Sequence, residues 1–157
     1  MESIQQPAIF RDSEGAAWQI TIKYGDILRV MRHVMTADNK PLDICYMAET
    51  GELSSITDHI HILVKCVYWL LQPDITDYTG KTGQDAQEWF YSRIDADCLE
   101  SMSKALLQAI ANFTPSPVIK SAILTAGELA DKAQIVTALE ILAGQLDGST
   151  ITPAQSA

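Results

Sequence analysis

The chain has 157 residues, of which 47% are apolar and 20% are charged, and its formal net charge is −9 at pH 7. This length suits one domain, and such a domain buries roughly two thirds of its unfolded surface without needing disulfides. An acidic chain with no run of Lys or Arg repels phosphate backbones, so we expect protein partners with basic patches and no nucleic acid.

The three cysteines, Cys45, Cys66 and Cys98, are far apart and form no CxxC pair. This spacing indicates buried, reduced thiols and not a disulfide framework. The first ten residues, MESIQQPAIF, contain no basic region followed by an apolar run, so they do not resemble a secretory signal. We therefore expect a cytoplasmic protein.

A β-hairpin is predicted near the N-terminus, at about residues 8–23. Its strands are Ala8–Arg11 and Trp18–Lys23, joined by a turn around Asp12–Gly15. The second strand alternates, with its large apolar side chains on one face: Trp18, Ile20 and Ile22. Because an isolated two-stranded hairpin is marginal in water, this face should lie on helices. The outer edge of the hairpin is one candidate docking site for an extended partner strand.

The stretch that organises the chain is ITDHIHILVKCVYWLLQ, at Ile56–Gln72. A helix over Ile27–Met35, with Asp26 as its N-cap, and one or two helical turns at Leu42–Met47 precede it. Polar residues recur in the stretch at spacings of four, three and four, so on a helix they form one solvent-facing stripe: His61, Lys65, Tyr68 and Gln72. The other faces are apolar, which predicts a buried central helix that ends at Pro73.

This apolar stretch does not predict a membrane span. A spanning helix needs about 20 predominantly apolar residues. The stretch is shorter, contains His61 and Lys65, and stops at Pro73. A core helix with other helices on several sides is the predicted arrangement.

Helix breakers between Pro73 and Gly83 predict a loop. Helical patterns resume after it, at about Gln84–Arg93, up to Phe113, from Ser116 onward, and at Leu129–Leu146. Asp95 or Asp97 is the expected N-cap of the helix that ends at Phe113, and Ser116 is the expected N-cap of the helix after it. Trp89, Phe90 and Tyr91 are consecutive, so on a helix their side chains fan out by about 100° steps. Tyr91 is the one expected to point outward or to bridge to a neighbouring element.

The sequence therefore predicts a mainly α protein. Residues 1–146 form a single helical domain around the buried central helix, with a small N-terminal β-hairpin. Residues 147–157, DGSTITPAQSA, have no periodic apolar face and predict a disordered C-terminal tail.

No catalytic or ligand-binding motif stands out. His59 and His61 point about 200° apart on a helix and cannot share one metal ion. Asp58 and His61 share a face, but no further pair of ligands completes a site. The GKTG sequence at Gly80–Gly83 lacks the spacing of a phosphate-binding loop. We expect a non-enzymatic protein without catalytic, cofactor-binding or metal residues, and a small metal-dependent enzyme that uses Asp58 and His61 is one alternative.

The order of these elements resembles a known family. The second strand and first helix contain WQITIKYGDILRVMRHV, the central helix ends in WLLQP, and WFYSRIDADCLESMSKALLQAIANFTPSP follows. Over about Trp18–Pro117 this layout is similar to that of prophage-encoded tail assembly chaperones, with a role like that of the lambda protein G. The matching features are Phe90, Asp97–Glu100, Ala105–Leu107, Phe113 and Pro115–Pro117. The Pro73–Gly83 segment is longer and more polar than the resemblance implies.

The resemblance implies a binding function in a bacterial host cell. Such a chaperone keeps the tape-measure protein, a long helical chain, in solution and recruits tail tube subunits to it. A frameshift near the C-terminus can extend members of that family, and the segment after Asp147 would accept such an extension. The candidate partner-binding residues are Trp89, Tyr91, Lys65 and Tyr68. The alternative from another class is a host-encoded acidic helical adaptor or regulatory module.

Overall fold

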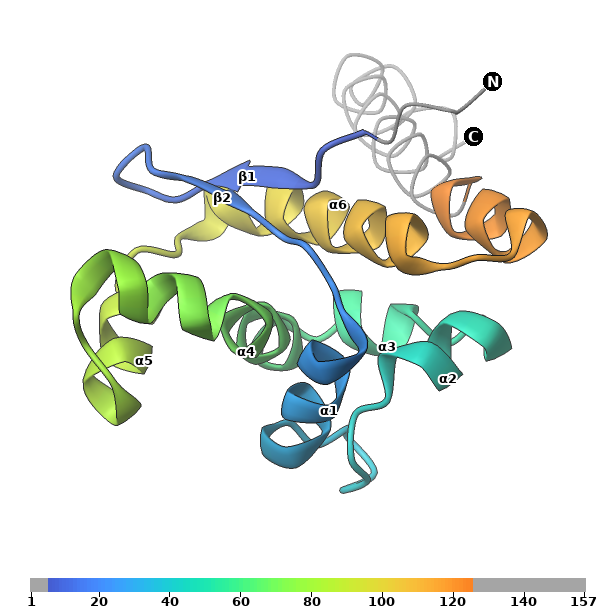
Figure 1. The fold of residues 1–157 in the computed structure, drawn as a ribbon, viewed down its shortest axis with the longest axis horizontal. Coiled ribbons are helices and arrows are strands. Elements are labelled where there is room, and N and C mark those ends of the chain that lie inside the picture. Colours follow the sequence, from blue (N-terminus) through green and yellow to red (C-terminus); the bar gives the residue numbers. More distant parts are fainter. Residues whose placement is uncertain (1–5, 126–157) are drawn as a thin grey trace, which may run out of the picture. The chain divides into compact units, whose positions relative to one another are not determined.

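The computed structural model of the chain describes residues 6–125, which are mainly helical, with one two-stranded antiparallel sheet near the N-terminus (Figure 1). The predicted fold class is thus confirmed. The described residues up to Leu124 belong to one unit of the chain. The predicted helix Leu129–Leu146, the domain end at residue 146 and the tail at 147–157 lie outside the described residues.

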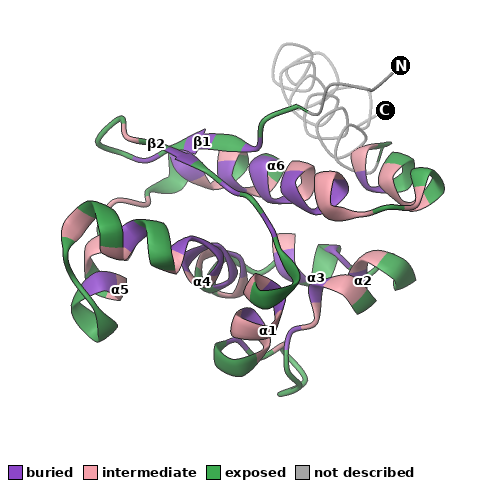
Figure 2. Cartoon of the chain, in the orientation of Figure 1, coloured by how far each residue is buried: buried purple, intermediate pink, exposed green. Residues whose placement is uncertain are grey.

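The hairpin consists of β1 (Ile9–Arg11) and β2 (Ala17–Gln19), with Phe10 opposite Trp18. The strands are shorter than predicted, but the alternation is as predicted and continues beyond them. The buried side chains of this segment lie at every second position: Ala8, Phe10, Trp18, Ile20 and Ile22. β1 contacts the long helix α6 (Ala96–Phe113), so the hairpin covers the core with its apolar face (Figure 2).

The first helix, α1 (Tyr24–His33), begins three residues earlier than predicted because Asp26 caps it from a different position. Lys23 lies at the N-cap, and Asp26 is the third residue of the helix. Its carboxylate accepts a hydrogen bond of 2.8 Å from the Lys23 backbone N–H. This contact is the carboxylate half of a capping box, in which the acid reaches back to the N-cap residue.

Two short helices, α2 (Ile44–Thr50) and α3 (Ser54–Thr57), lead to α4 (Ile60–Thr79). The predicted central helix is therefore interrupted. Ile56 lies in α3, and His59 has an extended backbone at the N-cap of α4.

At its other end α4 passes through Pro73 and stops only at Gly80, whose φ of 73° is the left-handed conformation that glycine adopts readily. The predictions of a helix end at Pro73 and of a loop over Pro73–Gly83 are thus wrong. The next helix, α5 (Gly83–Tyr91), follows after a short connection.

The side chain of Arg29 explains how α4 continues through the proline. Proline has no N–H, so in α4 the carbonyl of Trp69, four residues earlier, loses its helical donor. Arg29 of α1 replaces it, because its Nε donates to the Trp69 carbonyl at 2.7 Å and its Nη2 donates to the Leu70 carbonyl at 3.3 Å. Asp26 holds the same guanidinium at 2.8 Å. This contact ties α1 to α4.

The core is built around α4, which contacts α1, α3, α5 and α6. The largest side chains that are fully buried come from every part of the described chain: Phe10, Ile27, Leu42, Ile44, Ile56, Tyr68, Leu71, Ile75, Phe90, Met102, Leu106 and Ile110. None of the described helices combines the length and the apolar character that crossing a bilayer requires.

The C-terminal part of the described chain follows the predicted signals closely. Asp95 caps α6, as its carboxylate accepts a hydrogen bond of 3.0 Å from the Cys98 backbone N–H. After α6 a further helix occupies 117–125. Its N-cap is Ser116, whose hydroxyl oxygen accepts from the Ile119 N–H at 3.4 Å. Ser116 was the predicted cap of this helix, and Asp95 was one of the two candidates, with Asp97, for the cap of α6.

A double-mutant cycle tests the role of Arg29. Arg29→Met is expected to lower the free energy of unfolding by about 2 kcal/mol, because the Trp69 carbonyl loses its donor. In a Pro73→Ala background the N–H of residue 73 can take that place, so the same substitution should cost about 1 kcal/mol less. Urea unfolding of the four proteins measures this difference. Equal costs in both backgrounds would contradict the role assigned to Arg29.

Candidate functional site

An apolar groove with a volume of about 440 Å³ lies beside the first turns of α4. We call it the α4–α6 groove. Its aliphatic lining consists of Ile60, Val64, Ile94, Ala96 and Leu99. Its polar and aromatic lining consists of His61, Lys65, Tyr91 and Asp95. A mostly apolar concavity of this size with a few polar groups is the usual form of a ligand-binding or partner-binding site.

One wall of the groove is the N-terminal half of α4. Ile60 and Val64 lie four residues apart on one face, and His61 and Lys65 lie next to them with the same spacing. Ile60 is 57% exposed, although the sequence analysis assigned it to the core. It is the first residue of α4, directly after the chain leaves α3, so the packing that buries later turns does not reach it. His61 and Lys65 are exposed, as predicted.

Tyr68 belongs to the same predicted stripe but is only 1% exposed, so the prediction that it faces solvent is wrong. The reason is that α5 packs against α4 at this turn. The Tyr68 ring lies 5.9 Å from that of Phe90 and 5.7 Å from that of Tyr91, measured between centroids. Burial raises the pKa of its hydroxyl. Tyr68 therefore supports Tyr91 and is not itself available to a partner.

The two aromatic candidates on α5 separate in the structure. Tyr91 is half-buried and lines the groove, where it bridges to Tyr68 of α4. Trp89 lies two residues away, about 200° around the helix, and does not line the groove. Its ring packs against Trp18 at 6.0 Å, and the guanidinium of Arg93 lies 4.5 Å above it. Of the four predicted residues, the groove thus brings together Lys65 and Tyr91.

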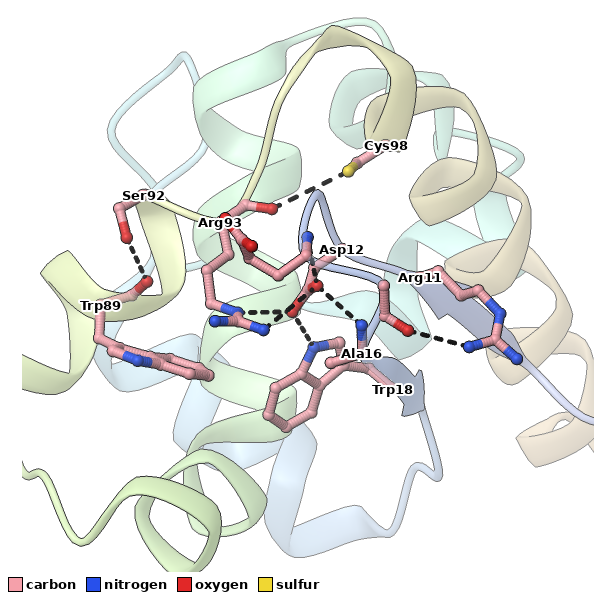
Figure 3. A network of polar contacts seen from close by, with 10 residues as sticks. Arg11, Asp12, Ala16, Trp18, Trp89, Ser92, Arg93 and Cys98 are labelled. Carbon is pink, nitrogen blue, oxygen red and sulfur yellow. Dashed lines mark hydrogen bonds and ion pairs between the residues drawn. The ribbon is translucent and has the colours of Figure 1, made fainter.

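The second wall is the α5–α6 connection, and a buried carboxylate in the hairpin turn fixes it (Figure 3). The side chain of Asp12 has no exposed surface. It accepts hydrogen bonds from four groups: Nε of Arg93 at 2.8 Å, Nε1 of Trp18 at 2.9 Å, and the backbone N–H groups of Glu14 at 2.9 Å and Ala16 at 3.0 Å. The last two are local bonds of the turn, but Arg93 is 81 residues away in the chain.

The main chain of Arg93 is held in the same place. Its carbonyl accepts a hydrogen bond from the Ser13 N–H at 2.8 Å and a weaker one from the thiol of Cys98 at 3.9 Å. Arg93 stands between Tyr91 and Ile94, two residues that line the groove. The hairpin turn therefore determines where this wall lies.

The ionisation of Asp12 is set by opposing effects. Burial alone would raise the pKa of the carboxyl, but hydrogen bonds from Arg93, Trp18, Ala16 and Glu14 outweigh it, and the pKa is lowered. A carboxyl whose pKa is lower in the folded than in the unfolded state stabilises the fold at pH values above its pKa in the unfolded state. This contribution is lost as the pH falls through its pKa in the folded state.

The other reactive side chains do not form a second site with these residues. Within residues 6–125 no group of three or more His, Cys, Asp or Glu side chains is placed to hold a metal ion. The three cysteines are free, and burial raises the pKa of Cys66 to about 12. Burial also raises the pKa of Cys45 and of Cys98. Thiols of this kind are protonated at neutral pH and are poor nucleophiles.

Comparison of the chain with protein-family models, with curated proteins and with solved structures found no match. The chemistry of the groove must therefore be judged from its own side chains. They offer an aliphatic surface with one positive side chain, Lys65, and one negative side chain, Asp95. This combination suits an amphipathic segment of another protein.

Sequence patterns missed two parts of this site. A periodicity pattern predicts core positions for the aliphatic groove residues, and it cannot show that the fold leaves them accessible: Ile60, Val64, Ile94 and Leu99. The Asp12–Arg93 pair had one local signal, the acidic residue at the start of a turn, but nothing in the sequence points to its distant partner.

The Asp12 network can be tested through its pH dependence. Asp12→Asn should lower the free energy of unfolding at pH 7 by about 3 kcal/mol, because it leaves Arg93 without its buried counter-charge. The difference from the wild type should shrink as the pH falls below about 4, the ordinary pKa of Asp in an unfolded chain, and towards the lowered pKa of Asp12 in the folded protein. Urea unfolding of both proteins at several pH values measures this difference in the free energy of unfolding. Asp38→Asn, at an exposed loop residue, is the control and should match the wild type. A difference that does not change with pH would refute the role of the carboxylate charge.

Proposed function

We propose that the protein is a non-enzymatic tail assembly chaperone of a phage or prophage. It binds a tape-measure protein and tail tube subunits in the bacterial cytoplasm during tail assembly. The observation that carries the proposal is the α4–α6 groove, an accessible apolar concavity with Tyr91 and Lys65 in its lining. The resemblance of Trp18–Pro117 to tail assembly chaperones is what suggests the partners.

The groove suits transient holding of a helical chain. A tape-measure protein exposes apolar stripes along its helices until the tail tube surrounds it, and exposed apolar surface drives aggregation. A groove of limited size covers part of such a stripe without the large buried area of a permanent complex, so the partner can be released. The net charge of −9 keeps the chaperone and its complex in solution and disfavours contact between copies.

The proposal requires a long helical tape-measure protein to be encoded beside this chain, and co-expression with that neighbour tests it. The wild type should keep that neighbour soluble, and Ile60→Glu should weaken the complex about tenfold, the scale of one important interface contact. Glu is favourable in the first turn of a helix, so α4 should still form. Met35→Glu is the matched control, since Met35 is 55% exposed and Ile60 57%, and Met35 lies outside the groove.

The amounts of the neighbouring protein in the soluble and pelleted fractions are quantified after lysis. If the neighbour is equally soluble with and without this chain, the chaperone proposal fails. Flanking reading frames that encode neither a tube nor a tape-measure protein would instead favour a host-encoded adaptor.

A further inference from the structure

The walls of the α4–α6 groove restrict what kind of segment can lie in it. Ile60, His61, Val64 and Lys65 of the lining lie in α4, and Ala96 and Leu99 lie in α6. The N–H groups of Ile60, His61 and Ala96 have no partner within their helix, because they lie in a first helical turn. They belong to two separate helix ends and do not form the alternating row of N–H and C=O groups that an added strand needs. An extended strand in the groove would find no row of free backbone partners and would leave its own N–H and C=O groups unpaired. A helix satisfies its own backbone and presents only side chains.

The charges at the groove differ between its two sides. Lys65 is exposed on the α4 side, and within residues 6–125 it forms no ion pair. Asp95 is exposed at the start of α6 on the other side, where Cys98 N–H holds its carboxylate in place. A bound segment that lies between them therefore meets a positive group on one flank and a negative group on the other.

We infer that the α4–α6 groove holds one amphipathic helix whose apolar stripe faces Val64 and Leu99, with an acidic flank beside Lys65 and a basic flank beside Asp95. This inference rests on the proposed function, since it describes the part of the partner that such a chaperone would hold. A general attraction between this acidic protein and a basic partner would not require an acidic flank on the bound helix. The inference adds that requirement.

Three designed 18-residue helical peptides with the same leucine stripe test this inference. One carries Glu on one flank and Lys on the other, one carries Lys on both flanks, and one carries Glu on both. A helix can enter the groove in either direction, so the mixed peptide can always match the two charges. It should bind the full-length chain about threefold more tightly than either of the others, the scale of one exposed ion pair. Fluorescence anisotropy of labelled peptides measures the affinities.

Charge variants of the chain should change this ranking in a defined way. Lys65→Glu should make the peptide with two Lys flanks bind most tightly. Asp95→Asn should abolish the advantage of the mixed peptide over the peptide with two Glu flanks, because both can still place a Glu beside Lys65, and Asn retains the ability to cap α6. Lys81→Glu and Asp38→Asn change the net charge by the same amounts at exposed residues outside the groove and should leave the ranking unchanged.

Several results would overturn the inference. These are equal affinities for the three peptides, a ranking that Lys65→Glu leaves unchanged, and peptide binding that Ile60→Glu does not weaken. Self-association of the wild type that Ile60→Glu abolishes would show that the groove holds a second copy of this chain. If any of these occurs while the co-expressed neighbour still depends on this chain, the proposed function stands without this helix site. If the peptides rank as expected but the neighbour does not need the chain, the proposed function fails instead.

Discussion

The fold depends on burying a long apolar helix that contains a proline. α4 can serve as the centre of the core only if it continues past Pro73, and Arg29 makes this possible by donating to the carbonyl that the proline leaves without a partner. The later turns of α4 add Ile75 to the core and carry the chain to Gly80, from which α5 returns against α4. That return buries Tyr68 and places Tyr91 at the groove.

A second long-range contact complements the first. The hairpin packs on α6 through apolar side chains, and such contacts stabilise the packing without fixing one orientation. The buried carboxylate of Asp12 fixes the orientation, because its hydrogen bonds to Arg93 and Trp18 require one arrangement of the hairpin turn and the α5–α6 connection (Figure 3). Arg29 and Arg93 thus act alike. Each is an arginine from one element that satisfies oxygen atoms of another, over 40 and 81 residues of sequence respectively.

The α4–α6 groove follows from these two constraints. The break at His59 turns Ile60 outward, and the position of Arg93 holds Tyr91 and Ile94 opposite it. The groove has a largely aliphatic lining, with Lys65 from α4 and Asp95 from the N-cap of α6 as its charged side chains. Such a surface suits recognition of another protein, and the proposed chaperone function is based on it.

The sequence alone determined the features that depend on near neighbours. The mainly α class, the alternation of Trp18, Ile20 and Ile22, and the caps at Asp95 and Ser116 were all predictable, because a cap or an amphipathic face is decided within a few residues. Tertiary structure decided the rest. Whether Pro73 ends a helix depends on a donor from another helix, and whether Tyr68 meets solvent depends on where α5 packs. The groove combines residues of α4, α5 and α6 that are distant in sequence, and a periodic pattern shows only which face of a helix is apolar and not what covers that face.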